Sequence, residues 1–526
     1  MPRTAGTTGS IDIVLSSSGW HRRVWALALP VMLANLTQPI LGLVDTAVAG
    51  HLGGSGPLGA VALGGLFFSF VFWSFGFLRM ATTGLIAQAH GVAAAVSNTV
   101  TAGTGGARPD MAHGRARDNP QWALHVILLR GLLLAAALGL AIWAVHAPLL
   151  HYGLRALGAA HAGDVVSHDA LVYSRARIVA APFALLNYVV LGYLLGLQRM
   201  RLALLFQAIV NAVNLIAVLL AVYVFHAGVA GIGAATACAD IVGFACAFGI
   251  VCPPIKAAVA YRKADRHRRA ENILHRASDP APAGADADAD TGANTADASA
   301  IFYWLAWRRM FALNRDIFGR TLCLQVAFGW FAHAGAQQGA VVLAANAILL
   351  HFQTFMAYAL DGFAQAAEVL VGAAVGARQR AVFRRSIVVC AVWASVTAVL
   401  FGLAYHLSGA AIVDSLTSDP DVRTTAYRYL VWVDVLPLAS VLGFVLDGVF
   451  IGATRTRPML GSMALSLLLF GLACWIAYPR YGNHGLWAAL IVFLTARSVT
   501  LALCLPALTA TIERRPGDGE TRVESA

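Results

Sequence analysis

Long apolar runs dominate this chain and limit what it can fold into. A membrane-spanning helix needs about 20 mostly apolar residues, and twelve runs of that order follow one another here. Only 12% of the 526 residues are charged, against about 25% in ordinary globular domains. We therefore predict an all-α polytopic membrane protein with about twelve transmembrane helices. The runs lie near residues 22–49, 58–89, 122–147, 170–196, 202–226, 229–252, 316–338, 341–373, 386–408, 424–452, 458–479 and 484–508.

Arginines gather in alternate loops between these runs, and this asymmetry predicts the orientation. Arg22 and Arg23 precede the first run, and Arg199 and Arg201 follow the fourth. The other set of loops is free of Lys and Arg at 51–57, 225–228 and 334–339. Since cytoplasmic loops carry the excess of Lys and Arg, we expect both termini in the cytoplasm and the protein in the inner cell membrane. The first run is too long for a removable signal peptide, so none is expected.

Two halves of the chain resemble each other. GYLLGLQRMR (192–201) and GVFIGATRTR (448–457) share both glycines and both arginines, and Gly91 aligns with Gly376. Each half holds an even number of runs, so the two repeats run in the same direction, related by an axis along the membrane normal. The pattern predicts two six-helix pseudo-symmetric lobes.

Between the halves the apolar pattern stops. Residues 256–276 are basic and have a helical pattern, whereas 277–300 are rich in Ala, Asp and Pro, a composition typical of a disordered linker. Aromatic and basic residues at 301–311 suit a segment lying at the membrane interface. We divide the chain into an N-lobe at 1–253, a cytoplasmic linker with the interfacial segment at 254–315, a C-lobe at 316–510 and a cytoplasmic tail at 511–526.

One carboxylate, Asp45, stands near the far end of the first apolar run. A charged side chain inside a membrane costs roughly 2.5–3.5 kcal/mol or more, so it is usually found where it functions or pairs. One helical stripe holds Asn35, Gln38, Gly42 and Asp45 at i, i+3, i+7 and i+10. We expect this stripe to face protein, and Pro30 and Pro39 to be candidate bends of the helix.

The second half carries a longer polar stripe. It consists of His351, Thr354, Tyr358, Asp361, Gln365 and Glu368, all on one helical face. Carboxylates and a histidine facing a bundle interior suit a proton relay or a cation site. The alternative is that these side chains only satisfy one another and hold helices together. The same alternative applies to Gln207, Asn211, Asn214, Thr236 and Asp240. Arg79, near the inner end of the second run, either belongs to the site or extends to the interface.

Motifs of enzymes are missing from the sequence. We find no nucleophile elbow, HExxH helix, phosphate-binding Walker loop or dinucleotide fingerprint. Asp286, Asp288 and Asp290 lack the glycine and the flanking helices of a calcium loop. We therefore expect no enzymatic activity, no cofactor and no metal site, and the missing ATPase motif favours ion-driven transport.

Several segments in order resemble one family. They are ALALPVMLANLTQPILGLVDTAVAGHLG (26–53), FLRMATTGLIAQAHG (77–91), NRDIFGRTLCLQ (314–325), YALDGFAQAAE (358–368) and DGVFIGATR (447–455). They are similar to the multidrug and toxic compound extrusion (MATE) transporters, particularly the branch of DNA-damage-inducible protein F (DinF). The resemblance implies a twelve-helix, V-shaped antiporter that expels organic cations or other amphiphiles in exchange for protons or sodium.

The resemblance also suggests site residues. The family's first-helix acid falls on Asp45, and its cation-site asparagine and threonine fall on Asn214 and Thr236. Some relatives place a second acid four residues after that asparagine, where this chain has Val218, which favours a proton over sodium. Asp240, one turn beyond Thr236, is a candidate replacement. In the C-lobe the ionisable candidates are Asp361, Glu368, Asp434 and Asp447.

The leading hypothesis is a multidrug antiporter whose partners are protons or sodium, amphiphilic organic cations and the lipid bilayer. Nucleic acid is not an expected partner, and the protein is expected to function as a monomer. One alternative is a lipid-linked oligosaccharide flippase of the same superfamily, which should need a strongly cationic cavity. The charge predicted to be buried is mostly acidic apart from Arg79, which disfavours it. The other alternative is a membrane enzyme or scaffold.

Overall fold

The apolar runs form helices, because a backbone in lipid must satisfy its polar groups internally. The computed structural model describes residues 17–52, 55–101, 120–157, 164–278 and 303–513. Within these ranges the chain is helical apart from short connections and contains no β-strand, as predicted. The helices are α1 (Ser17–Gly50), α2 (Ser55–Ser74), α3 (Phe77–Thr101), α4 (Pro120–Ala144), α5 (His146–Ala156), α6 (Asp164–Ile178), α7 (Ala181–Gly196), α8 (Met200–Leu219), the π-helical turn η3 (Leu220–Val224), α9 (Gly228–Ser278), α11 (Trp304–Gln337), α12 (Ala340–Gly376), α13 (Arg380–Leu416), α14 (Pro420–Gly452), α15 (Arg457–Tyr481) and α16 (Asn483–Glu513).

The described residues hold nine helices long and apolar enough to cross a membrane, or ten if α6 and α7, bent by 54° at their junction, count as one span. The second predicted span is α2 together with α3. Two further helices of 34 residues, α1 and α11, occupy the places of the first and seventh predicted spans. The chain is thus an all-α polytopic membrane protein.

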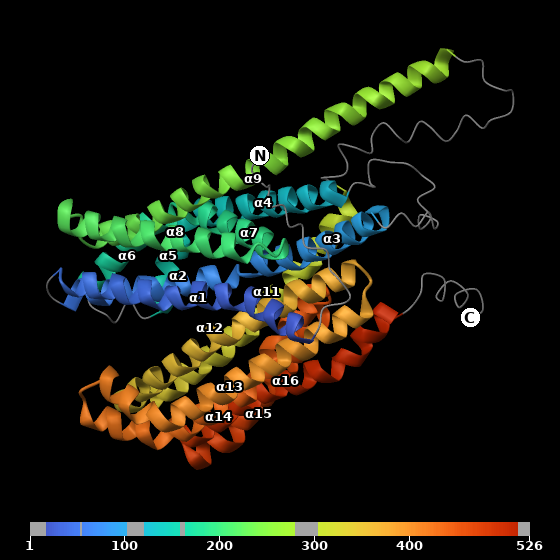
Figure 1. Cartoon of the computed structure of the whole chain (residues 1–526). Helices are drawn as coiled ribbons and strands as arrows, with labels where there is room; N and C mark the ends of the chain where they lie inside the picture. Colours follow the sequence, from blue (N-terminus) through green and yellow to red (C-terminus); the bar gives the residue numbers. More distant parts are fainter. Residues whose placement is uncertain (1–16, 53–54, 102–119, 158–163, 279–302, 514–526) are drawn as a thin grey trace.

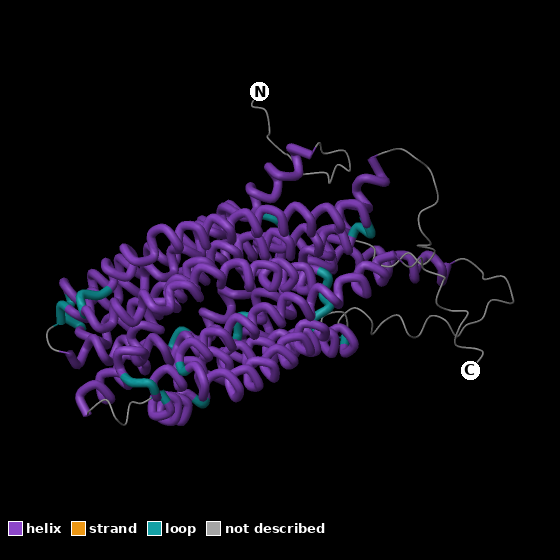
Figure 2. The backbone as a smooth tube through the Cα atoms, turned by 90° about the horizontal axis from the view of Figure 1, so that it is seen from below, coloured by secondary structure: helices purple, strands orange, loops and turns teal. Residues whose placement is uncertain are grey.

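The helices run side by side along one general direction (Figures 1 and 2), and Figure 1 shows that they gather into two bundles. One bundle is built from α1 to α9 and the other from α12 to α16, with α11 packed mainly on α15. Beyond the first bundle α9 continues as one helix to Ser278, through the basic segment expected at 256–276. The interfacial segment expected at 301–311 falls at the start of α11, which continues into the seventh span.

Among the described residues, α1 and α3 contact α12 and α14 of the other lobe. Near the beginning of α1, the Trp25 ring packs edge-on against Phe363 of α12, with ring centroids 5.3 Å apart. In the middle of α3, Gln88 donates a hydrogen bond of 2.9 Å to the carbonyl of Gly452 at the end of α14. These contacts lie at the helix ends that neighbour the arginine-bearing loops. Toward the opposite ends the two bundles diverge in Figure 1.

At this contact, equivalent residues of the two sequence repeats occupy equivalent places in the structure. A Cβ atom on Gly91 of α3 would lie 2.1 Å from the carbonyl oxygen of Ala373, and one on Gly376 of α12 would lie 2.0 Å from that of Gln88. Gly91 and Gly376 are equivalent in the two repeats, and so are Gln88 and Ala373. The lobes therefore meet through two symmetry-related contacts of backbone on backbone, which only glycine permits.

The repeated stretches at 192–201 and 448–457 also end their helices in the same way. Arg199 donates its backbone N–H to Leu194, and Arg455 donates to Phe450, both at 2.9 Å. The residue before each arginine is left-handed, with φ of 60° at Gln198 and 52° at Thr454. Both residues take part in contacts, because Gln198 accepts a hydrogen bond from Arg23 and Thr454 accepts one from Gln88. The matching sequences thus encode matching helix ends.

Candidate functional site

The polar stripe of α12 extends from the end where the two bundles diverge to the contact between the lobes. His351 and Thr354 at its upper end are exposed, Tyr358 and Asp361 are half-buried, and Glu368 at its lower end is only 2% exposed. The Asp361 carboxylate accepts a hydrogen bond of 3.2 Å from Asn35 of α1 and one of 2.6 Å from Gln365. Since Asn35 belongs to the other lobe, the stripe faces the space between the lobes.

Glu368 lies where α3, α12 and α14 meet. Its side chain interacts with Thr83 of α3 and is within electrostatic range of Arg79 on the same helix. The Oε1 atom is buried and has no hydrogen-bond partner among the described residues. On the other side, a Cβ on Gly452 of α14 would lie 2.1 Å from the Glu368 carbonyl oxygen. The arrangement places an ionisable group inside the contact that closes one end of the molecule.

A second cluster occupies the N-lobe around Asp45 of α1. The Asp45 carboxylate is half-buried, and its Oδ1 atom has no hydrogen-bond partner within the described part of the chain. The charged group that acts on Asp45 is Arg177 of α6, which is also within electrostatic range of Asp240 of α9. Asn187 of α7 donates a hydrogen bond of 2.9 Å to the Asp240 carbonyl. Asp45 and Asp240, far apart in sequence, are thus both within electrostatic range of Arg177.

The predicted asparagine and threonine pair is formed in the same lobe. Asn214 of α8 donates to the Thr236 hydroxyl of α9 at 3.4 Å, while the Asn214 amide oxygen stays buried without a partner among the described atoms. One turn earlier on α8, Asn211 donates to Thr37 of α1 at 2.5 Å. These amide contacts tie α1, α8 and α9 together beside the charged cluster.

In the C-lobe, Asp447 of α14 is buried between two arginines. Arg320 of α11 and Arg497 of α16 both donate to its Oδ2 atom, and Arg497 is only 3% exposed. Both arginines are therefore paired, and their positive charges exceed the single carboxylate by one.

These arginines correct one interpretation of the sequence. The buried charge was expected to be mostly acidic apart from Arg79, but Arg320 and Arg497 are buried as well, and Arg177 lies inside the N-lobe cluster. They were not predicted to be buried, because arginines beside apolar runs were interpreted as marks of orientation. The available signal was position, since all three lie within predicted spans.

The clusters are linked across the molecule. Tyr188 of α7 is within electrostatic range of Asp240, Arg177, Arg79 and Tyr358, and so connects the N-lobe cluster with the stripe of α12. Arg497 is within electrostatic range of Asp361, so the stripe of α12 and the Asp447 cluster interact within the C-lobe.

Two predicted residues of α1 cannot be placed in this way. The side chains of Gln38 and Pro39 lie outside the described residues, although the helix continues through both positions. Pro30 is described, and α1 is one continuous helix through it. Among the described residues, no three His, Cys, Asp or Glu side chains form a group that could hold a metal ion.

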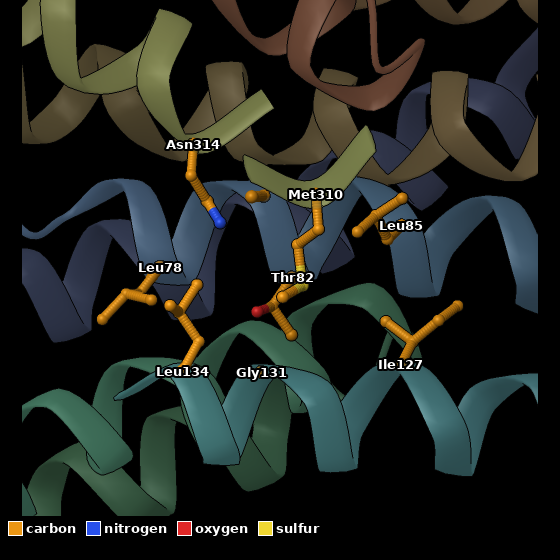
Figure 3. Close-up of a pocket in the computed structure, with 9 residues that line it drawn as sticks. Leu78, Thr82, Leu85, Ile127, Gly131, Leu134, Met310 and Asn314 are labelled. Carbon is orange, nitrogen blue, oxygen red and sulfur yellow. The ribbon is translucent and has the colours of Figure 1, made fainter. Parts of the chain in front are cut away.

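A small pocket lies apart from the charged clusters, between α3, α4 and α11 (Figure 3). It is lined mostly by apolar side chains such as Leu78, Leu134 and Met310, and Asn314 points into it from α11. Its empty space is at most about 230 Å³, whereas small-molecule sites measure about 300–1,000 Å³. We therefore place the candidate site between the lobes and not in this pocket.

Known proteins resemble this chain over most of its length. A family model described as MatE matches residues 30–104 and 322–476. The DNA damage-inducible protein F of Escherichia coli (strain K12) is 35% identical over 490 residues, which cover 91% of each chain. The probable multidrug resistance protein NorM of Chromobacterium violaceum is 25% identical, covering 92% of this chain and 93% of its own.

A solved structure shows the same fold. A transporter of the MOP superfamily from Pyrococcus furiosus is 17% identical to this chain and matches its structure with a TM-score of 0.71. The match covers 94% of this chain and 97% of that chain. The likeness extends over both lobes, so the two-lobed architecture predicted from the repeat is confirmed.

Proposed function

The chain belongs to the MATE family, in the branch of DNA damage-inducible protein F, and on that premise we propose that it is a secondary active antiporter. It exports amphiphilic organic cations in exchange for protons. Relatives named for multidrug resistance support the class of substrate. Transport, and not enzymatic chemistry, is the activity that the site suits.

The observation that carries the proposal is the stripe of α12. Its groups pass from exposed at His351 to buried at Glu368, on the helix face that meets the other lobe at Asn35. Carboxylates in such a position attract a cationic substrate from the open half of the molecule. A proton that reaches the same carboxylates removes that attraction, so substrate and proton exclude each other.

Coupling further requires that the two lobe arrangements differ in affinity for the proton, because equal affinity shifts no equilibrium. Glu368 suits this requirement, since it is buried between α3 and α14 at the contact between the lobes. When the lobes part at this end, the carboxylate regains water and its preferred protonation state changes. Asp45, with its unpartnered Oδ1 atom, is the corresponding proton acceptor of the N-lobe.

The arginine-bearing loops support an orientation. Arg22, Arg199 and Arg455 all lie at the end where the lobes touch. Cytoplasmic loops carry the excess of positive charge, so the touching ends face the cytoplasm and the open half faces the outside. The protein is then an inner-membrane monomer with cytoplasmic termini, in its outward-open state.

A lipid-linked oligosaccharide flippase is the second candidate, and the buried arginines are the observation that favours it. A pyrophosphate group needs several free cationic side chains. Arg320 and Arg497 already bind Asp447, and Arg177 donates to Tyr173 and is within electrostatic range of Asp45 and Asp240. Because these guanidiniums already interact with groups of the protein, organic cations are the better substrate class.

The test is drug-induced proton movement in proteoliposomes that contain the purified protein and a pH-sensitive dye inside. Addition of a lipophilic cation such as ethidium should release protons in potassium buffer as well as in sodium buffer. Empty liposomes control for passive leakage. If the drug-induced response requires sodium, the coupling ion is sodium and not the proton. If the drug causes no ion movement at all, antiport is refuted.

A further inference from the structure

The first turns of α1 pack on the C-lobe through aromatic rings. The Trp393 indole of α13 donates from Nε1 to the Nδ1 atom of His21 at 2.9 Å, and the two rings meet edge-on with centroids 6.0 Å apart. One turn later on α1, the Trp25 ring packs edge-on against Trp393 and Phe363 of α12, with centroids 5.2 Å and 5.3 Å apart. These rings join α1 to α12 and α13 at the end where the lobes touch.

The hydrogen bond between Trp393 and His21 requires a neutral imidazole. An indole N–H can donate but not accept, so the Nδ1 atom of His21 is the acceptor and carries no proton. In a protonated imidazole both ring nitrogens are donors, and the indole would then face a second N–H group. The contact between α1 and α13 is therefore compatible with His21 only in its uncharged form.

Among the described residues, no acid forms an ion pair with His21. In α12, the Glu368 carboxylate interacts with Thr83 of α3, and α2 carries no charged residue. The other charged and titratable groups at this end of α1 and of the helices packed on it are basic. They are Arg22 and Arg23 of α1, His90 of α3, Arg199 at the start of α8, Lys256 of α9, Arg378 after α12, and Arg380, Arg384 and Arg385 of α13. A proton on His21 would thus remove the hydrogen bond without supplying an ion pair in its place.

His21 lies where a proton from the cytoplasm can reach it. Its side chain is half-buried, and the neighbouring Arg22 is exposed. In the proposed orientation this arginine-bearing end of the molecule is the cytoplasmic one. When the lobes part here, α1 separates from α13 and the Nδ1 atom becomes free to take up a proton. Imidazole is the side chain that titrates in the range of physiological pH.

We propose that His21 and Trp393 form a pH-sensitive latch between the lobes. The latch is closed while His21 is neutral, and a proton from an acidic cytoplasm removes the acceptor and opens it. The closed latch binds fewer protons than the open one, so low pH shifts the equilibrium toward the state with the cytoplasmic ends apart. Under the proposed antiport, this shift slows the return to the outward-open state and limits proton entry into an already acidic cytoplasm. That consequence rests on the proposed function, whereas the latch does not.

The latch is tested by measuring the distance between the lobes without any drug. Spin-labelled ketone amino acids in place of Arg201 of α8 and Arg457 of α15, both exposed, leave the seven native cysteines unchanged. Double electron–electron resonance on the full-length protein in nanodiscs gives the open fraction at about pH 7.5 and about pH 5.5, on either side of the titration of imidazole. In the wild type, the ratio of open to closed protein should rise at least about fivefold on acidification.

Three variants separate the latch from other titrating groups. The amide oxygen of His21→Asn can accept from Trp393 at any pH, so the rise on acidification should be about fivefold smaller than in the wild type. Trp393→Phe removes the donor and keeps a ring, so the open fraction should be high already at the higher pH. His90→Asn is the matched control. It changes a histidine whose Nδ1 atom has no hydrogen-bond partner within the described ranges, and it should keep the wild-type rise.

The proposal is overturned if His21→Asn shows the full wild-type rise, or if Trp393→Phe has the wild-type open fraction at both pH values. If Trp393→Phe does not fold, the comparison of the wild type with His21→Asn and His90→Asn decides alone. An equal loss of the rise in His90→Asn would assign the response to the basic end as a whole, which also refutes the latch.

Transport in proteoliposomes separates the latch from the proposed function. Both sides are acidified together, so that the pH difference across the membrane stays constant. The rate of drug-induced proton movement should then fall about fivefold more in the wild type than in His21→Asn. No drug-induced movement in either protein would refute antiport and leave the distance measurements valid. Equal falls in both proteins would support antiport and refute the limit on proton entry.

Discussion

The two lobes contain charge clusters of inverse composition. In the N-lobe one guanidinium, Arg177, is within electrostatic range of the carboxylates of Asp45 and Asp240. In the C-lobe one carboxylate, Asp447, lies between the guanidiniums of Arg320 and Arg497. Arginine remains charged under all physiological conditions, so the two guanidiniums beside Asp447 are permanently positive. Carboxylates can take up a proton, so the N-lobe cluster can change its charge.

The difference teaches which lobe carries the exchange chemistry. A buried ion pair that cannot be neutralised holds helices in place, and losing one partner leaves an uncompensated charge. Asp45 has no arginine within ion-pair distance among the described residues, and its Oδ1 atom has no hydrogen-bond partner there. We therefore propose that the C-lobe triad is an anchor and that Asp45 takes part in the exchange.

The largest effect is expected from a substitution of Asp447, the carboxylate that pairs with both C-lobe arginines. Asp447→Asn should leave Arg320 and Arg497 buried without a counter-charge, at a cost of about 3–5 kcal/mol. We expect loss of folded protein from the membrane, measured by size-exclusion chromatography of a fluorescent fusion. Asp447→Glu, which retains the charge, is the matched control. Normal abundance and thermal stability of the amide variant would show that Asp447 is not the anchor and would strengthen its predicted role in coupling.

Asp45→Asn should instead give a folded protein that cannot couple a pH gradient to export. The amide imitates a permanently protonated carboxyl group, and Arg177 still has Asp240 as a partner. The initial rate of proton-driven export of a fluorescent cation should fall at least about tenfold, measured in inverted vesicles with wild type and variant at equal abundance. Coupling at the wild-type rate would remove Asp45 from the mechanism.

Glu368→Gln and Asp361→Asn test whether the two carboxylates at the boundary between the lobes contribute to export. Neutralising Glu368 removes an ionisable group from the closed contact, and changing Asp361 weakens its bond to Asn35. Each should lower the rate of export by about fivefold or more, the range of ordinary coupling free energies, at unchanged abundance. If both variants export at full rate, the stripe of α12 only holds helices together.

The smallest effect is expected at an exposed ion pair. Arg423 and Asp414 are 3.4 Å apart near the start of α14, where both side chains are partly open to solvent. Asp414→Asn should change the free energy of unfolding by only about 0.2–1 kcal/mol, measured as a small change in melting temperature. A loss comparable with that of Asp447→Asn would mean that burial does not distinguish the two ion pairs.

Periodicity was sufficient to find the groups that lie on one helix. The spacing from His351 to Glu368 predicted one face of α12, and the structure places that face toward the other lobe. Single acids inside apolar runs, such as Asp45, were also visible, because the cost of burying a charge makes them conspicuous. The matching motifs at 192–201 and 448–457 predicted the two lobes for a related reason, since equal sequences gave equal helix ends.

Partners on different helices could not be predicted in this way. Arg497 is 50 residues from Asp447, and Arg320 is 127 residues from it. Nothing in the period of either helix indicates that these side chains meet. Arg177 was hidden for another reason, because it becomes an inner residue only through the bend between α6 and α7. Pairing across helices is set by packing, which a single sequence does not display.

The reciprocal contact of Gly91 and Gly376 bears on the kinetics of the transport cycle. Main-chain atoms meet there without side chains between them, so these two contacts tolerate little change in the distance between the helices. We expect both contacts to be lost together when the lobes part at this end. Gly91→Ala or Gly376→Ala should therefore shift the resting population toward the state in which the lobes are apart at this end. The shift should be the same for every compound that is transported.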